Sequence, residues 1–157
     1  MTTDDIIRLL QLQPLPFEGG WFRETYRSTA TVGTKSLTTA IYYLITPTSF
    51  SRLHRLPADE LFHFYFGDPV SQLNLMPDGT SKVIMLGNDL TQKQLIQWLV
   101  PAGIWQGSRL KRGGQFALLG TTMSPGFDPS DLEIGLKDDL AHAYPDQVDE
   151  ITMLTAS

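Results

Sequence analysis

Apolar and polar residues alternate with a period of two through most of the chain, from about residue 21 to residue 122. Runs of strand length, rich in β-branched and aromatic residues, are separated by segments that contain glycine or proline. They predict about eight strands, over residues 21–27, 37–45, 51–56, 60–66, 70–76, 81–86, 95–100 and 115–122. Asp78-Gly79 is the strongest hairpin signal between two of them. Short strands at this spacing predict an antiparallel sandwich or barrel.

The two ends of the chain have helical spacing instead. Thr3 can cap a short N-terminal helix, which ends before Pro14. Residues 131–154 again space their leucines as a helix does, until Pro145 interrupts the pattern. We therefore expect an all-β protein with short helices at both ends.

The length of 157 residues fits a single domain. We expect a barrel over about residues 18–128 and a helical tail over about residues 131–155. Apolar residues make up 41% of the chain, enough for a core, and charged residues only 18%, too few for a disordered protein. The absence of cysteine excludes disulfides, thiolate metal sites and cysteine nucleophiles.

The net charge of −5 is unevenly distributed, because residues 128–157 carry a balance of −7 and residues 1–127 a balance of +2. An acidic chain without a basic stripe is not expected to bind nucleic acid or an anionic membrane. No apolar run approaches the roughly 18 residues of a membrane span, and the first residues lack the basic segment of a signal peptide. We therefore expect a cytoplasmic protein.

Candidate site residues come from two distant parts of the chain. Arg52 and His54 alternate in phase, so we expect them to project from one face of their strand. Glu60 opens the next predicted strand, and Gly67 closes it. The segment PAGIWQ follows much later, at residues 101–106.

This arrangement resembles the two motifs of the cupin superfamily. Glu60 begins a Glu-x6-Gly segment that fits the end of the first motif, where His54 falls near the second histidine and Arg52 occupies the first. In the second motif, Gln106 stands where the fourth ligand, a histidine, would be. The resemblance implies the cupin jelly roll, a double-stranded antiparallel β-barrel.

The resemblance is most specific to the cupin-5 family of uncharacterised cupin-like proteins. The matching segments are EGGWFRETYR at residues 18–27, DELFHFY at 59–65, PAGIWQ at 101–106 and SPGFD at 124–128. There are two departures, because Pro16-Phe17 replaces a His-Pro pair and Phe62 replaces a tryptophan. Cupins include epimerases, oxygenases, decarboxylases and binding proteins, so the resemblance specifies the fold more than the reaction. It also implies a homodimer.

A typical cupin metal site combines three imidazoles with one carboxylate, a set that suits Mn, Fe, Ni or Zn. The corresponding residues are Arg52, His54, Glu60 and Gln106. The cation of Arg52 would repel a divalent metal, and the amide of Gln106 is a poor replacement for imidazole. We therefore expect no tightly held metal as cofactor; a divalent metal, if bound, would use His54, Glu60 and Gln106.

A pocket without a metal can still perform acid–base chemistry. Phe62 and Trp105 would line its mouth and raise the pKa of Glu60 by desolvation, unless a neighbouring cation keeps the carboxylate ionised. Glu60 and His54 would then move a proton to or from a carbon acid or a sugar hydroxyl. Simple alternation places His63 on the face opposite Glu60, and a β-bulge would turn it inward as a further catalytic group.

Four further residues are candidates for substrate binding. Arg52 would hold a carboxylate or phosphate, and Gln106 would orient a carbonyl or hydroxyl. Glu24 and Tyr26 share one face of the first predicted strand and are candidate pocket groups. Arg27 is expected on the opposite face, in an ion-pair row at a sheet edge.

Three hypotheses about function follow. The first is an enzyme that isomerises or epimerises a sugar or nucleotide sugar. The second is a sensor or carrier that binds a small molecule in the same pocket without turnover, and the third is a metal-dependent dioxygenase or lyase. The polar residues could also form a satisfied buried network with no ligand at all.

Overall fold

The computed structural model describes residues 1–156. Helix α1 (Thr3–Leu10) begins the chain, and Thr2 caps it instead of the expected Thr3. Helices α2 (Lys137–Ala143) and α3 (Val148–Leu154) form the tail, and Pro145 begins the short turn between them. Single 3-10 turns are η1 (Leu90–Gln92), η2 (Pro129–Asp131) and η3 (Pro145–Gln147). The strands are β1 (Gln13–Pro14), β2 (Trp21–Arg27), β3 (Thr31–Val32), β4 (Lys35–Ser36), β5 (Thr39–Ile45), β6 (Ser51–Arg55), β7 (Asp59–Gly67), β8 (Val70–Leu75), β9 (Ser81–Leu86), β10 (Gln97–Val100), β11 (Trp105–Leu110), β12 (Ala117–Ser124) and β13 (Glu133–Ile134).

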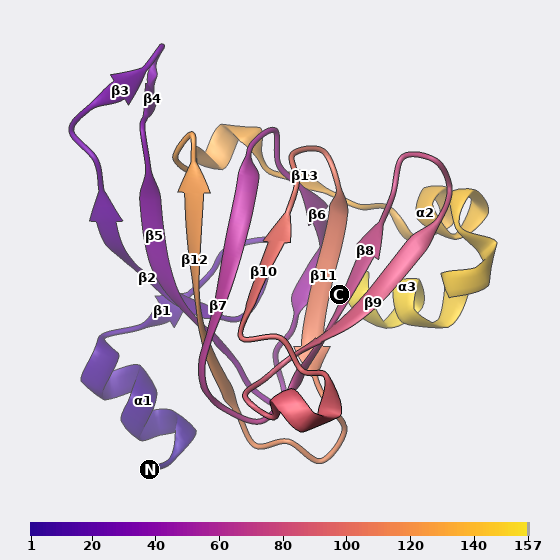
Figure 1. Cartoon of the computed structure of the whole chain (residues 1–157), viewed down its shortest axis with the longest axis horizontal. Coiled ribbons are helices and arrows are strands. Elements are labelled where there is room, and N and C mark those ends of the chain that lie inside the picture. Colours follow the sequence, from indigo (N-terminus) through magenta and orange to yellow (C-terminus); the bar gives the residue numbers. More distant parts are fainter. Residues whose placement is uncertain (157) are drawn as a thin grey trace.

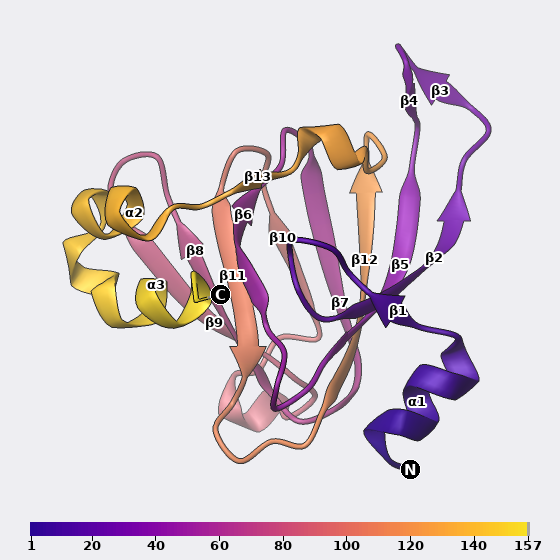
Figure 2. The same ribbon diagram turned by 180° about the vertical axis from the view of Figure 1, so that it is seen from behind.

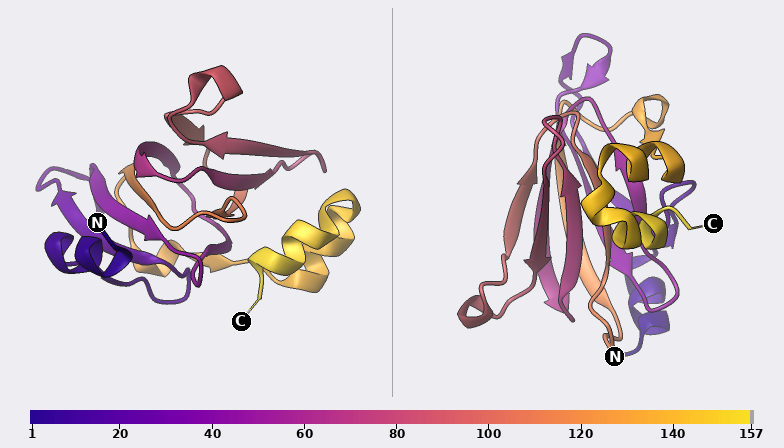
Figure 3. Two further views of the ribbon diagram at one scale, coloured as in Figure 1. Left: turned by 90° about the horizontal axis from the view of Figure 1, so that it is seen from below. Right: turned by 90° about the vertical axis from the view of Figure 1, so that its right-hand side faces the viewer.

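The strands form two antiparallel sheets (Figure 1). One has the order β1-β2-β5-β12-β7-β10 and the other the order β13-β6-β11-β8-β9. The short ribbon of β3 and β4 projects beyond the ends of both sheets (Figure 1). Seen along the strands, the sheets face each other as the two walls of a jelly roll (Figure 3). The predicted all-β antiparallel fold with short terminal helices is confirmed.

The space between the sheets is filled by alternate residues of each strand. Phe62 and Phe64 of β7 point into it and pack with Leu119 of β12 and Val70 of β8. Burial of this apolar surface supplies most of the stabilisation that holds the two sheets together. Toward the end of the jelly roll where β12 finishes, this apolar core gives way to carboxylates and hydroxyls.

The terminal helices cover the outer faces of the two sheets (Figure 2). Leu140 of α2 and Ile151 and Leu154 of α3 pack on Leu53 and Leu73 of the five-stranded sheet. The apolar side of α1 packs in the same way on β5 and β12 of the six-stranded sheet. Among residues 1–156, the helices are too short or too polar to cross a membrane.

The sequence pattern misses strand β11, which carries Gln106. Its inward side chains, Gln106 and Ser108, are polar, whereas its outward Gly107 lies against Leu53 and Leu154. In most strands of a jelly roll the inward residues are apolar and the outward residues are polar. Strand β11 has polar residues on its inner face and a covered outer face, so the period-two pattern does not predict it. The other predicted strands agree with the structure to within a few residues at their ends.

Candidate active site

A small cavity lies at the end of the jelly roll where β12 finishes. Its volume is about 40 Å³, room for about three water molecules. Most of its wall is apolar, with three carboxylates and two hydroxyls among the hydrocarbon. The wall consists of Leu15, Glu18, Phe22, Glu24, Thr39, Ile41, Leu56, Glu60, Thr121, Met123 and Phe127. A few polar groups that converge in an apolar hollow are typical of a small-molecule site.

Glu60 meets this cavity from the start of β7. Only 6% of the residue is exposed, because it shares the inward face of the strand with Phe62. From the opposite sheet, Gln106 Nε2 donates a hydrogen bond of 2.7 Å to Glu60 Oε2. Burial raises the pKa of Glu60 above its ordinary value, and the negative charge of Glu18 raises it further, whereas the charge of His54 and two hydrogen bonds oppose the rise.

Glu18 is the second carboxylate of the cavity, with 12% of its side chain exposed, and the sequence prediction did not include it. The main chain holds it in place, because Arg52 N donates to Glu18 O at 2.8 Å. Ser51 Oγ donates to Glu18 Oε1 at 3.3 Å, and His54 Nε2 lies 3.6 Å from the same oxygen. Glu18 therefore connects the cavity to a buried imidazole.

His54 lies behind Glu18 and is almost completely buried. Its Nδ1 is 2.6 Å from the main-chain oxygen of Arg52. Because a carbonyl oxygen only accepts, Nδ1 carries a hydrogen and donates it to this oxygen. Within residues 1–156, Nε2 has no hydrogen-bond partner. A small movement toward Glu18 would therefore allow these two groups to exchange a proton.

Gln106 is brought next to both groups by the pairing of β11. It is the cross-strand partner of His54 on β6, and its side chain binds Glu60 on the other sheet. His54, Glu60 and Gln106 thus lie together, although they come from distant parts of the chain. Gln106, and not His54, forms the hydrogen bond that holds the Glu60 carboxyl.

The prediction that Arg52 projects into the pocket beside His54 is wrong. Strand β6 has a bulge at which two residues, the first of them Arg52, oppose Gly107 of β11. This extra residue breaks the alternation, so that Ser51 and His54 share the inner face instead. Arg52 is absent from the cavity wall, and its Nε is buried without a hydrogen-bond partner among the described residues. The main chain of Arg52 forms hydrogen bonds with Glu18 and His54, whereas its guanidinium does not line the cavity.

A second bulge, on β2, separates the predicted pair Glu24 and Tyr26. Glu24 lines the cavity, whereas Tyr26 is 55% exposed and lies on the other face. Arg27 therefore lies on the same inner face as Glu24, although simple alternation placed it on the opposite face. Its guanidinium donates to both carboxylate oxygens of Glu24, at 2.8 and 2.9 Å, and to Phe127 O at 2.9 Å. The ion pair forms part of the rim of the cavity.

His63 points away from Glu60, so its predicted catalytic role is not supported by its position. Its Nε2 lies 3.1 Å from Thr122 Oγ1, and Gln97 Nε2 lies 3.2 Å from its Nδ1. The ring stacks on Tyr65 on the outer face of the six-stranded sheet, with the two ring planes 6° apart. The bulge in the pairing of β7 with β12 lies between Phe64 and Phe66, on the side of His63 away from Glu60. It therefore does not turn His63 inward.

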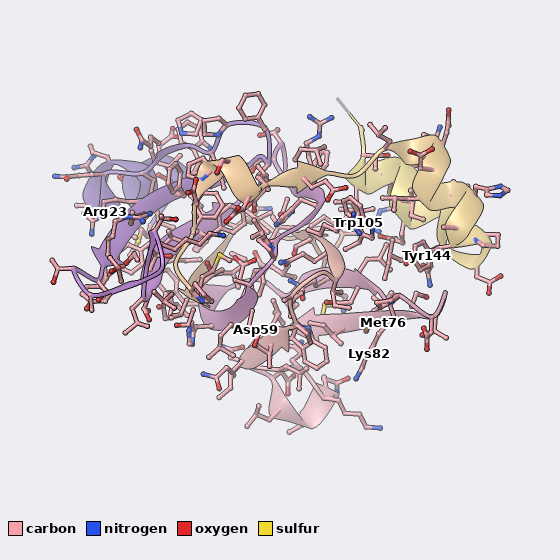
Figure 4. The ribbon with its side chains drawn as sticks, turned by 90° about the horizontal axis from the view of Figure 1, so that it is seen from above. Arg23, Asp59, Met76, Lys82, Trp105 and Tyr144 are labelled. Atoms are coloured by element: carbon pink, nitrogen blue, oxygen red, sulfur yellow. The ribbon has the colours of Figure 1, made fainter. Side chains whose placement is uncertain are left out.

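The aromatic lining also differs from the prediction. Trp105 lies on the outer face of β11, on the side of the C-terminal helices (Figure 4), where Arg55 Cζ is 4.6 Å from the centre of its ring. Phe62 points inward but belongs to the packed core, not to the cavity wall. Phe22 and Phe127 supply the aromatic rings of the cavity instead.

The residues at the cavity do not fit the metal site typical of cupins. His54 is the one imidazole beside the cavity among the described residues, and Gln106 directs an amide N–H donor at Glu60. Over residues 1–156, no group of three or more His, Asp or Glu side chains is placed to hold a metal ion. Three imidazoles and a carboxylate are thus replaced by one imidazole, one amide and two carboxylates.

Glu18 carries a sequence signal that could have identified it. It opens the EGGWFRETYR segment, and the two glycines that follow it both have positive φ, 95° for Gly19 and 78° for Gly20. Such a backbone favours glycine and turns the chain sharply before β2. A glutamate held next to such a turn would have been a reasonable candidate for a site that needs exact placement.

The buried carboxyl of Glu60 should make the folded protein less stable as the pH rises. The unfolded chain releases this proton near its ordinary pKa of 4.5, whereas the folded protein keeps it to higher pH. Between these two values the unfolded state binds fewer protons, so the free energy of unfolding falls with increasing pH. We expect Glu60→Gln to abolish this fall, so that it loses less stability than the wild type between pH 4.5 and pH 7.

Urea unfolding below pH 4.5 and at pH 7 measures this difference. The exposed Glu133, replaced by glutamine, is the matched control, and it should leave the pH dependence of the wild type in place. If Glu60→Gln loses stability between these pH values as steeply as the wild type, Glu60 does not cause the effect.

Comparison with known proteins matches residues 4–135 to the Cupin_5 family, described as Cupin superfamily (DUF985). Two solved structures are similar over essentially the whole chain. A hypothetical protein from Leishmania major has a TM-score of 0.93 and 30% identity, and the match covers 100% of both chains. Protein SO0799 from Shewanella oneidensis has a TM-score of 0.92 and 34% identity, and the match covers 99% of this chain and 98% of that one.

A curated relative is an uncharacterized protein of Saccharomyces cerevisiae, YML079W. It is 29% identical over 158 residues, which cover 87% of this chain and 78% of the yeast protein. Oxalate decarboxylase from Bacillus subtilis shares the fold, with a TM-score of 0.60, 15% identity and coverage of 92% of this chain and 37% of the enzyme. With its family model matched over residues 4–135, the chain belongs to the Cupin_5 family of the cupin superfamily.

Proposed function

We propose that the protein binds a small hydroxy-carbonyl compound, of the kind found among simple sugars, and moves a proton between its carbon and oxygen atoms. The observation that carries this proposal is the buried Glu60 carboxyl, which meets the cavity and is oriented by Gln106. Its raised pKa brings a carboxyl closer to neutral pH, where general acid–base catalysis is most efficient. This is the chemistry of a sugar isomerase or epimerase.

The proposed step uses two carboxyl groups of the cavity, Glu18 and Glu60. Glu60 as carboxylate removes the hydrogen from the carbon that carries the hydroxyl, and Glu18 relays a proton from His54 to the neighbouring carbonyl oxygen. The resulting enediol takes the proton back from Glu60 at the other carbon and returns its hydroxyl proton to Glu18. His54 Nε2, 3.6 Å from Glu18, can hold a proton behind it. Gln106 is a positioning residue.

The size of the cavity favours the smallest members of this substrate class. Room for about three water molecules suits a compound of a few non-hydrogen atoms, and a whole nucleotide sugar is far larger. Phosphate groups would also need cations, and Arg52, which was expected to supply one, is not in the wall. The likeness to oxalate decarboxylase at 15% identity concerns the fold and is no support for oxalate as substrate.

Solvent hydrogen exchange tests the proposal even though the substrate is unidentified. The protein would be incubated in D₂O with glycolaldehyde, dihydroxyacetone, glyceraldehyde and simple pentoses, and proton NMR would follow the carbon-bound hydrogens. We expect deuterium to replace the hydrogen next to the carbonyl faster than in protein-free buffer. Binding of these compounds without exchange would contradict the enzyme and identify a non-catalytic carrier that uses the same cavity.

A further inference from the structure

The ionisable side chains in the described wall of the cavity are all carboxylic acids. Its ionisable wall residues are Glu18, Glu24 and Glu60, and among residues 1–156 neither lysine nor arginine contributes to the wall. Glu24 is balanced by Arg27, which holds both of its oxygens. The remaining two carboxyl groups face the cavity, and His54 lies behind Glu18, outside the wall.

Arg27 is engaged with Glu24 and is not part of the cavity wall. Two of its hydrogen bonds go to Glu24 and a third goes to Phe127 O, and none of the three uses Nη1. Because Arg27 is absent from the wall, its remaining donors lie outside the cavity.

A negative charge inside the cavity would meet no lysine, arginine or histidine in the described wall. Charges interact strongly where water is excluded, so a ligand carboxylate would be repelled by Glu18 and Glu60. It would also lose its hydration without gaining donors, because most of the wall is hydrocarbon. Ligand O–H and N–H groups, by contrast, find carboxylate and threonine oxygens, among them Thr121.

We infer that this cavity selects small ligands that donate hydrogen bonds and carry no negative charge, either neutral hydroxyl compounds or primary ammonium compounds, and that it rejects carboxylates and phosphates. The inference rests on the proposed function, because it concerns the charge of the ligands that the same cavity accepts. Phe22 and Phe127 add ring faces that suit carbon chains and ammonium groups equally.

Three probes of equal size separate the charge classes. Ethylene glycol, ethanolamine and acetate have the same number of non-hydrogen atoms and are neutral, cationic and anionic at pH 7. Each would be titrated into ¹⁵N-labelled protein, and amide shifts at Glu18, Glu60 and Thr121 would report binding in the cavity. We expect saturable shifts with ethylene glycol and ethanolamine, and at least about tenfold weaker binding of acetate.

The double variant Glu18→Gln, Glu60→Gln removes the two charges while it keeps side-chain size. We expect the double variant to bind ethanolamine about tenfold more weakly than the wild type does. The difference in affinity between acetate and ethylene glycol should become smaller or disappear. The surface variant Glu133→Gln is the matched control and should behave like the wild type.

Acetate binding as tight as that of the two donors, or a saturable response to none of the probes, would overturn the inference. Acetate binding that is lost in Arg27→Gln would overturn it too, because Arg27 would then be an anion anchor. None of these results decides the proposed function, since deuterium exchange into the sugars measures proton transfer independently of ligand charge.

Discussion

Replacing Glu60 by glutamine should slow the exchange of carbon-bound hydrogen with solvent by about 10²–10⁴-fold, the usual contribution of a general base. Glutamine has the same shape and retains an oxygen that can accept the hydrogen bond from Gln106, now 2.7 Å to Glu60 Oε2. It cannot take up a proton from carbon. Binding of the substrate, followed by NMR shifts, should therefore change only a few-fold while the exchange rate at saturation collapses.

His63→Ala provides the control for this experiment. His63 belongs to the same strand as Glu60, but it contacts Thr122 and Tyr65 on the outer face of the sheet. We expect its exchange rate to stay within about twofold of the wild type. Equal losses in both variants would indicate a general disturbance of β7, and full activity of Glu60→Gln would show that Glu60 is not the base.

Replacing Gly20 by alanine should destabilise the protein strongly, by about 3–5 kcal/mol, or prevent folding completely. Gly20 has φ of +78°, which an L side chain rarely adopts. A Cβ there would lie 2.5 Å from Tyr43 Oη and 2.7 Å from Cζ of that buried ring. Tyr43 cannot move freely, because its hydroxyl donates to Gly19 O at 2.7 Å, next to Glu18.

Gly103→Ala separates the strain of the backbone from the steric clash. Gly103 has φ of +81°, almost the same as Gly20, but nothing lies within 4 Å of the position its Cβ would take. We expect it to cost only about 1 kcal/mol. Urea unfolding of the two variants at one pH measures the difference. If both lose the same stability, the contact with Tyr43 is unimportant and the ring yields easily.

Most strands of the fold could be predicted because one side of each sheet faces an apolar interior. Alternation on β7 correctly places Glu60 and Phe62 on one face and His63 on the other. Prediction fails at the bulges, where one additional residue reverses the side to which the next side chain points. That is why Arg52 and Tyr26 were assigned to the pocket and Arg27 was not.

Trp105 shows a different limit. Adjacent residues of β11 point to opposite sheet faces, so Gln106 and Trp105 cannot both line the cavity. Choosing between them requires the register of β11 against β6 and β8, which depends on long-range pairing. A large aromatic residue is also stable under the C-terminal helices, so hydrophobicity alone does not decide its side.

The amino-acid sequence alone determined the local properties of this protein: short alternating strands, helical ends, an acidic tail and a set of polar residues that resembles the cupin motifs. These follow from periodicity and composition within a few neighbouring residues. Only the tertiary structure decided which polar groups meet, because bulges, strand register and the turn at Gly19 and Gly20 act between segments far apart in the chain. These features place Glu18 beside His54 and Glu60 and keep Arg52 out of the cavity wall. They therefore determine which charged groups face the cavity.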